Sequence, residues 1–238
     1  MDAADIMHEP GAAAPNIVEQ FDAGGALLLR SAMLDGLLHG LLEQFGATGK
    51  LAMSSHFYSG KLHGPMSVYD ADGVLVQRSS FRHGRAHGLI ETFVNGRRVA
   101  ARTMSDGLAS GPSLSFDEAG QMTARLHLAD GQLDGAAAFF HEGRQVRVAC
   151  YRNGLLDGES VDYDIEGRAV QRCAYRANLL HGALRRYWPN GAVMEETLYH
   201  DGVPLGLPTR FNQHSATLGQ VAPAPALFER LKQLVRGE

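Results

Sequence analysis

Histidine is the residue type whose spacing in this chain comes closest to a chemical motif. It stands directly before a glycine in four similar settings, at His39, His63, His87 and His181. Imidazole can bind a metal ion or transfer protons. In a meandering sheet, neighbouring equivalents of this kind would lie roughly 9.6 Å apart, too far to share one ion. We therefore interpret His-Gly as part of a turn and expect no metal site.

The two cysteines, Cys150 and Cys173, are not spaced to form a disulfide. They lie four and five residues before equivalent positions of a repeated unit, so their side chains should leave opposite faces of a sheet. Free thiols are typical of a reducing compartment, and we expect a cytoplasmic protein. No nucleophile motif and no carboxylate pair with a defined spacing stands out. The sequence therefore predicts a protein that is not an enzyme, with no catalytic residue and no cofactor.

These residues belong to a unit that recurs eight times with a period of 23 or 24 residues. Each copy carries two glycine columns four residues apart. The first column is Gly36, Gly60, Gly84, Gly107, Gly131, Gly154, Asn178 and Gly202. The second is Gly40, Gly64, Gly88, Gly111, Gly135, Gly158, Gly182 and Gly206. A fixed period of this length indicates a repeat array rather than a closed globular domain.

The unit varies in length at one place. In two copies one residue is missing before the third glycine, at Phe93–Gly96 and Phe140–Gly143. Hairpin tips absorb such changes and strands do not, so this segment should be a hairpin tip. Each repeat is then two strands and two turns. The glycines are expected as turn residues that need a positive φ or a close backbone approach.

Two columns of large side chains follow the same period. Five residues after the second glycine lie Phe45, Tyr69, Phe93, Phe116, Phe140, Tyr163, Tyr187 and Phe211. Three residues before the first glycine lie Met33, Phe57, Phe81, Met104, Leu128, Tyr151, Tyr175 and Tyr199. A ribbon without a second layer must be stabilised by contacts between neighbouring repeats, so we predict that both columns are structural ladders.

Two charged features are candidate partner-binding surfaces. Six residues before the first glycine, alternate repeats carry arginine at Arg30, Arg78, Arg125 and Arg172. Three residues separate this column from the large apolar column on the same strand, which predicts that the arginines project from the opposite face. The second feature is an acidic segment with carboxylates at Asp157, Glu159, Asp162 and Asp164. For both features, a solvated strand face or loop is the alternative.

The array predicts one structural domain with short tails. Residues 1–15 are expected to be a disordered tail, 16–212 the array, 213–225 a linker and 226–236 a helix. The apolar side of this helix would carry Leu227, Phe228, Leu231 and Leu234. It could cap the last strand edge of the array or bind a partner.

The net charge and the distribution of apolar residues disfavour some classes of partner and location. The formal net charge of −4 disfavours nucleic acid, because phosphate binding needs a net basic surface. No apolar run approaches the roughly 18 to 20 residues of a membrane span. The N-terminal residues lack the basic and apolar regions of a signal peptide.

The repeated unit resembles the MORN repeat in its bacterial variant. The resemblance is closest at residues 151–167 and 175–191, YRNGLLDGESVDYDIEG and YRANLLHGALRRYWPNG. It implies an all-β fold, an elongated single-layer antiparallel β-meander of about eight repeats, to which the sequence adds the short C-terminal α-helix. Bacterial proteins built from such repeats are often labelled as antitoxins, and some look like immunity or accessory proteins of secreted toxins. The repeat has no family active site to carry over.

The resemblance implies a scaffold that binds another protein. We expect a monomer whose partner is a toxin or a secreted effector, which the protein neutralises or chaperones, and whose gene lies nearby. The alternative is a peripheral scaffold that binds anionic lipid at a membrane, since eukaryotic relatives include membrane-linked scaffolds.

Overall fold

The computed structural model describes residues 14–220, which form 22 β-strands and no helix. The strands belong to one open antiparallel sheet, which confirms the predicted all-β meander. The tail before residue 14 and the predicted helix with Leu227, Phe228, Leu231 and Leu234 lie outside the described residues. The chain divides into two compact units within β10 (Leu108–Phe116): the first ends at Gly111, apart from Glu118–Gly120, which also belong to it.

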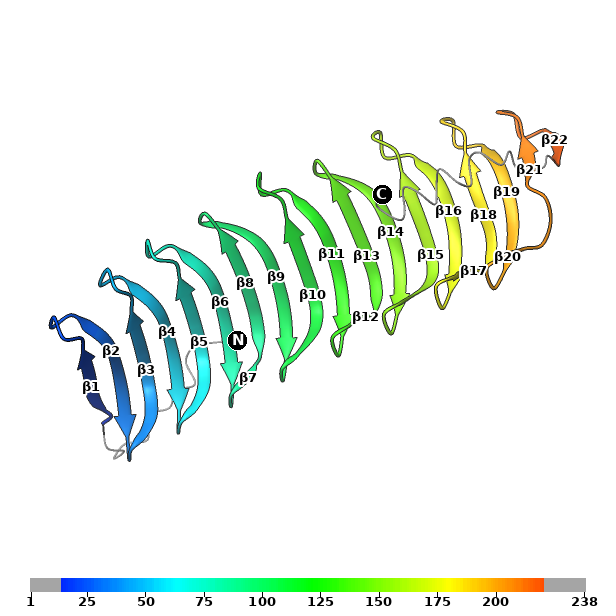
Figure 1. Ribbon diagram of the computed structural model, residues 1–238. Coiled ribbons are helices and arrows are strands. Elements are labelled where there is room, and N and C mark those ends of the chain that lie inside the picture. The colour runs from blue at the N-terminus through cyan, green and yellow to red at the C-terminus, as the bar shows by residue number, and fades with distance from the viewer. Residues whose placement is uncertain (1–13, 221–238) are drawn as a thin grey trace. The chain divides into compact units, whose positions relative to one another are not determined.

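Each unit is a single layer of strands joined by hairpins (Figure 1). The first unit contains β1 (Asn16–Phe21), β2 (Leu27–Leu34), β3 (Leu37–Phe45), β4 (Leu51–Tyr58), β5 (Lys61–Tyr69), β6 (Leu75–Arg82), β7 (Arg85–Ala86), β8 (Gly88–Val94) and β9 (Arg97–Ser105). The second contains β11 (Met122–Ala129), β12 (Gln132–Leu133), β13 (Gly135–His141), β14 (Arg144–Arg152), β15 (Leu155–Tyr163), β16 (Ala169–Arg176), β17 (Leu179–Leu180), β18 (Gly182–Tyr187), β19 (Val193–His200), β20 (Val203–Pro204), β21 (Thr209–Phe211) and β22 (Thr217–Gln220).

The first glycine column forms two-residue hairpin turns. Asn153 and Gly154 have φ angles of 49° and 80°, the left-handed pair of a type I′ turn. The Gly154 N–H also donates to the Leu133 carbonyl of the preceding repeat at 2.8 Å. Asn178 makes the same bond to Leu156 and has a φ of 69°, so the missing glycine leaves the turn intact.

The predicted hairpin tips are confirmed. In the two short copies the tip is a two-residue turn at Asn95–Gly96 and at Glu142–Gly143, with all four φ angles positive. Longer tips begin with a side chain that caps the turn. The Asp164 Oδ1 atom, for example, accepts the N–H groups of Glu166 and Arg168 at 3.0 and 2.9 Å.

The second glycine column is not a turn, contrary to expectation. Gly158 lies inside β15, with a φ of 118°, where the pairing with β14 shifts between Ala149 and Tyr151. This is a β-bulge, and Cys150 lies opposite it. A Cβ atom on Gly158 would come within 2.9 Å of the Cys150 Cβ. Positive φ therefore explains this column up to Gly182, and a close approach to the neighbouring strand adds to it at Gly158.

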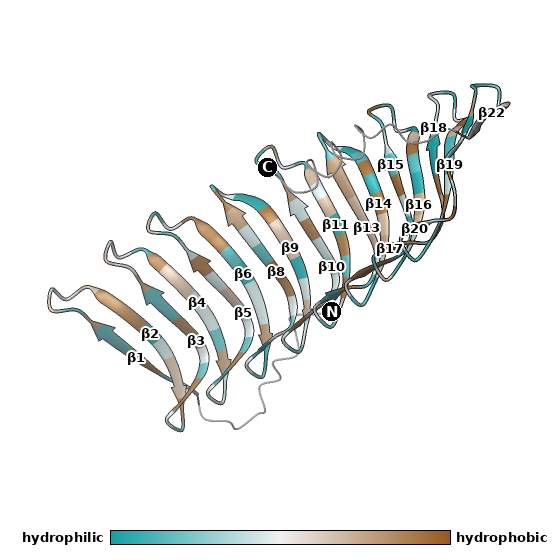
Figure 2. Ribbon diagram, turned by 45° about the vertical axis from the view of Figure 1, so that its right-hand side comes forward, coloured by the Kyte–Doolittle hydropathy of each residue, from teal (hydrophilic) through white to brown (hydrophobic). Residues whose placement is uncertain are grey.

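The register defines two faces in each unit. Directly opposed residues share a face, and in the second unit the row Ala137, Ala149, Ser160 and Cys173 lies on one of them. We call it the small-residue face; in the first unit it carries Ser31, Leu42, Ser55, Met66 and Ser79. We call the other face, which carries the predicted arginine column, the arginine face. Polar and apolar residues alternate along many strands (Figure 2).

Burial is concentrated in the row of small residues. Ala137 and Ala149 are each 1% exposed, and Ser55 is fully buried. A single layer covers a side chain only with its neighbours on the same face, so only small residues become fully enclosed. The Ser55 and Ser79 hydroxyls have no hydrogen-bond partner there.

The two columns of large side chains lie on opposite faces and do not stack directly. Tyr175 is on the small-residue face, whereas Tyr163 and Tyr187 are on the arginine face. Within the described part of the second unit, no ring contact joins Tyr163 to Tyr187, because equivalent strands are roughly 9.6 Å apart. If the columns are ladders, as predicted, the rings of Tyr163 and Tyr187 do not touch one another directly.

The array continues beyond the predicted boundary. Residues 213–225 were expected to be a linker, but β22 pairs with β21. The tip between them uses Asn212 as its capping residue, and Ser215 takes the left-handed conformation with a φ of 65°. Serine at the place of the third glycine hid this tip from the repeat pattern.

Candidate binding surface

The predicted arginine column lies on the arginine face, and Arg30, Arg78 and Arg172 contact carboxylates of neighbouring strands. The Arg30 Nε atom is 2.8 Å from Glu19, and its Nη1 atom is 3.4 Å from Glu43. Arg78 lies 3.7 Å from Glu91. The carboxylates raise the pKa of the Arg30 guanidinium, chiefly through the hydrogen bond to Glu19.

The same pattern holds in the second unit. Arg172 is 3.2 Å from Glu159, and Arg185, its neighbour on β18, is 2.5 Å from Glu196. Arg125 is exposed and opposes Ala138. Apart from Arg125, the column is therefore a row of paired charges of both signs rather than a uniformly basic stripe.

The four predicted acidic residues do not form one cluster. Asp157 lies 3.6 Å from Arg152 and accepts the Ala177 N–H at 3.4 Å. Asp162 belongs to the small-residue face, and Glu159 pairs with Arg172.

Asp164 caps a hairpin tip and carries a shifted pKa. Burial opposes its ionisation, but hydrogen bonds from the Arg168 guanidinium and from backbone N–H groups outweigh this effect. The pKa of Asp164 is therefore held below its usual value. Arg168 also contacts Glu166 at 2.6 Å, which fixes its guanidinium at the tip.

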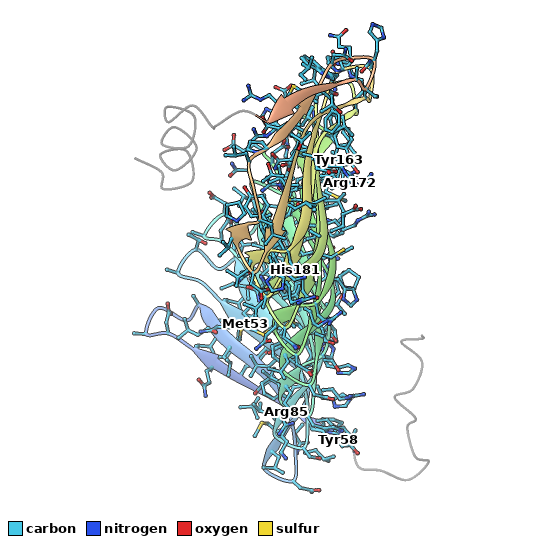
Figure 3. All side chains as sticks on the ribbon, turned by 90° about the vertical axis from the view of Figure 1, so that its right-hand side faces the viewer. Met53, Tyr58, Arg85, Tyr163, Arg172 and His181 are labelled. Atoms are coloured by element: carbon cyan, nitrogen blue, oxygen red, sulfur yellow. The ribbon has the colours of Figure 1, made fainter. Side chains whose placement is uncertain are left out.

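Two equivalent depressions lie on the second unit where β15 and β18 reach their hairpin tips. The first, of about 320 Å³, is lined by Arg144, Gln145, Tyr163, Ile165, Glu166 and Gly167. The second, of about 330 Å³, is lined by Arg168, Ala169, Arg172, Tyr187, Pro189, Asn190 and Gly191. We call them the tyrosine depressions. Tyr163 and Arg172 lie on the same side of the sheet (Figure 3).

The depressions are built by the repeat itself. Arg144 and Arg168 each follow a third glycine and are 24 residues apart, as are Tyr163 and Tyr187. The Arg144 Nη1 atom donates to the Ile165 carbonyl of the next tip at 3.1 Å, so the arginine is held beside the ring of Tyr163. A guanidinium has five N–H donors, which leaves capacity for a ligand.

The spacing of Tyr163 within the repeat could have predicted that it shares a face with the arginine column. Tyr163 follows the second glycine by five residues, an odd number, whereas Ser160 follows it by two, so the two side chains leave opposite faces. Counting in this way places Tyr163 with the arginine column.

A second polar array, which the sequence analysis missed, crosses the small-residue face of the second unit. Its members oppose one another strand by strand: Arg147, Asp162, Gln171, Arg186, Glu195 and Arg210. Arg147 hydrogen-bonds to Asp162, and Glu195 accepts bonds from Arg186 and Arg210 at 3.2 and 3.0 Å. In the first unit the same row contains no charge: Leu29, Gln44, Met53, Val68, Gln77, Thr92 and Ala100.

Tyr175 lies beside this array on the same face. Burial raises the pKa of its phenol to about 12, with a further contribution from its neighbour Cys173. Burial likewise raises the pKa of the Cys173 thiol. Cys150 leaves the other face, and both cysteines are free thiols, as expected from their spacing.

At His87, Asp134 and His181, the residue before the second glycine contacts the next repeat. The N–H of the next turn approaches its side chain: Asp106 N–H lies 3.4 Å from His87 Nδ1, and Asn153 N–H donates to Asp134 at 3.2 Å. His181 approaches Asp201 in the same way. His-Gly is therefore not itself a turn; at His87 and His181 the imidazole links the bulge to the N–H of the next hairpin turn.

Among the described residues, no helix is long and apolar enough to cross a membrane. The comparison with curated proteins found no match. Among solved structures, TarM aligns at 12% identity over 47% of this chain and 20% of that one, with a TM-score of 0.29. The Photorhabdus luminescens Tc holotoxin pore aligns at 12% identity over 82% of this chain and 15% of that one, with a TM-score of 0.24. This chain spans a fifth or less of each.

The comparison with protein families gives the clearer result. Residues 62–83 and 180–201 match the family described as MORN repeat variant. Both segments run from the strand before the second glycine to the first-glycine turn of the next repeat. The chain therefore carries MORN repeat variant segments in each of its two units, and repeats of this kind are generally scaffolds that bind proteins or lipids.

Proposed function

We propose that this protein is a non-enzymatic scaffold that binds another protein through the arginine face of its second unit. The tyrosine depressions carry this proposal. Tyrosine and arginine are the residues most enriched among interface hot spots, and here they recur side by side, held by the hydrogen bond of Arg144 to the next tip. A partner that places an apolar side chain in each depression would bury both rings.

The charges around the depressions favour a protein over anionic lipid. Arg172 and Arg185 are paired with Glu159 and Glu196. A lipid surface attracts clusters of unbalanced Lys and Arg, and each carboxylate here would be repelled by it. A protein surface can present complementary charges of both signs.

The finer form of the proposal is that the partner is a toxic or secreted protein, which this scaffold neutralises or chaperones in the cytoplasm as a monomer. Its support is the resemblance of the repeat to bacterial proteins labelled as antitoxins or immunity proteins. The match to the MORN repeat variant is in keeping with that resemblance.

Co-expression with the product of the neighbouring gene tests this function. We expect a complex on size exclusion and relief of any growth defect that the partner causes. Arg144→Glu combined with Arg172→Glu should weaken binding without unfolding the protein, because both side chains are at the surface. Arg30→Glu, in the first unit, is the matched control and should bind as the wild type does.

Two results would count against the proposal. Absence of a complex and of any growth effect rejects neutralisation of that partner. Flotation with anionic liposomes that is lost at high salt would instead favour the peripheral lipid-binding scaffold, because such binding is electrostatic.

A further inference from the structure

We propose that His181, His200 and Asp201 form a binding site for a divalent transition metal ion of the Zn²⁺ class. The two imidazoles and the carboxylate come from two successive turns of the second unit. His181 precedes the second glycine of one repeat, and His200 and Asp201 precede the first glycine of the next. Their donor atoms all lie within 4.8 Å of one another.

Each imidazole lies close to one oxygen of the Asp201 carboxylate. The His181 Nδ1 atom is 3.0 Å from Asp201 Oδ1, and the His200 Nδ1 atom is 3.4 Å from Asp201 Oδ2. Donors bound tetrahedrally to Zn²⁺ at about 2.0 to 2.2 Å are separated by about 3.3 to 3.5 Å. The His200 side chain is 63% exposed, so its ring can rotate to close the set without displacing a packed neighbour.

The donor types select the class of metal. Two imidazoles and one carboxylate suit Zn²⁺ and its first-row neighbours, whereas Ca²⁺ and Mg²⁺ prefer oxygen ligands alone. Three protein ligands leave at least one coordination position for water or for a side chain of a partner. The imidazole rings of His181 and His200 are neighbours, with centroids 4.9 Å apart.

The chain contains its own comparisons for this site. In the first unit His39 occupies the place of His181, but Tyr58 and Ser59 stand where His200 and Asp201 would be. His39 accordingly contacts the ring of Tyr58, at a centroid distance of 4.9 Å.

A second comparison has two of the three donors. His87 and Asp106 occupy the places of His181 and Asp201, with a separation of 3.4 Å between Nδ1 and Oδ1. Ser105 stands at the place of His200, and Asp106 is also paired with Arg82 at 3.0 Å. Of these three positions, only that of His181 therefore combines two imidazoles with a carboxylate.

Histidines at equivalent positions of neighbouring repeats are roughly 9.6 Å apart, which is why their spacing alone predicted no metal site. The ligands of this site occupy different positions in neighbouring repeats, which the hairpin turns bring together: the Gly202 N–H donates to the Leu180 carbonyl at 2.8 Å.

Titration of the tag-free full-length protein with Zn²⁺ by calorimetry, and with Co²⁺ by visible absorption, tests the proposal. We expect one ion per chain and weaker binding at acid pH, where protons compete for the imidazoles. Loss of even an outer-shell group typically costs about 10- to 100-fold in metal affinity, so His200→Ala should weaken binding more than about tenfold. Asp201→Asn, which keeps a residue suited to the left-handed turn, should do the same.

His87→Ala is the matched control and should bind metal as the wild type does. Thermal melts without metal should be alike for the wild type and His200→Ala, and added Zn²⁺ should raise the Tm of the wild type alone. The proposal is overturned if the wild type binds no stoichiometric ion, or if His200→Ala and Asp201→Asn bind it with unchanged affinity.

Discussion

Adding one methyl group at Gly158 tests the β-bulge at the second glycine of its repeat. In Gly158→Ala the new Cβ would meet the Cys150 Cβ at 2.9 Å, at a φ of 118°. The positive φ costs about 1 to 2 kcal/mol and overpacking about 1 to 3 kcal/mol, while the stiffer unfolded chain returns about 0.4 to 1 kcal/mol. We expect a net loss of about 3 kcal/mol.

Gly182→Ala is the matched control for this prediction. Gly182 occupies the same column with a φ of 96°, but its Cβ would lie 4.0 Å from Ala174. Only the backbone cost applies, so we expect a loss of about 1 kcal/mol. Urea melts followed by the fluorescence of Trp188, the single tryptophan, report on the second unit. Equal losses at the two glycines would refute the argument from close approach.

Three further predictions concern charge and protonation in the second unit. Asp164→Asn should lower the free energy of unfolding at neutral pH, as measured in urea melts. Because the pKa of Asp164 in the folded protein lies below the usual 3.8, this difference from the wild type should vanish as the pH falls through the folded pKa. Glu195→Ala should lower the free energy of unfolding by about 2 kcal/mol, because the Glu195 side chain is only 14% exposed and its removal leaves two guanidinium groups without their partner. Glu196→Ala should cost under about 1 kcal/mol in the same melts, because it breaks a more exposed ion pair. Tyr175 should ionise near its raised pKa of about 12 in a spectrophotometric titration, with the transition absent in Tyr175→Phe, and its contribution to stability should be lost between about pH 10 and 12.

Periodicity was sufficient to predict much of the fold. The residue missing from each of the segments Phe93–Gly96 and Phe140–Gly143 correctly located the hairpin tips. The alternation of side chains along a strand correctly predicted that Arg172 and Tyr175 lie on opposite faces of the sheet. The pattern failed where a non-glycine residue adopts a left-handed conformation, as at Ser215. At such a position the repeat pattern expects glycine, so a turn built on another residue type is not recognised from the sequence.

The candidate sites were harder to predict from the sequence than the fold was. Each is lined by residues that occupy different positions in adjacent repeats. Arg172 and Tyr187 differ in their place within the repeat, yet they line one depression. Likewise His181 meets Asp201 rather than another member of its own column. Equivalent positions lie roughly 9.6 Å apart, whereas these candidate sites form between non-equivalent positions of adjacent repeats.

Site-specific photo-crosslinking in the native host tests the central claim, that a protein docks on the arginine face of the second unit. A benzophenone amino acid would replace Tyr187 on that face, and Leu184 on the small-residue face of the same strand as the control. We predict one discrete crosslinked protein from position 187 and none from position 184. Identical products from both positions, or no protein product from position 187, would contradict the account.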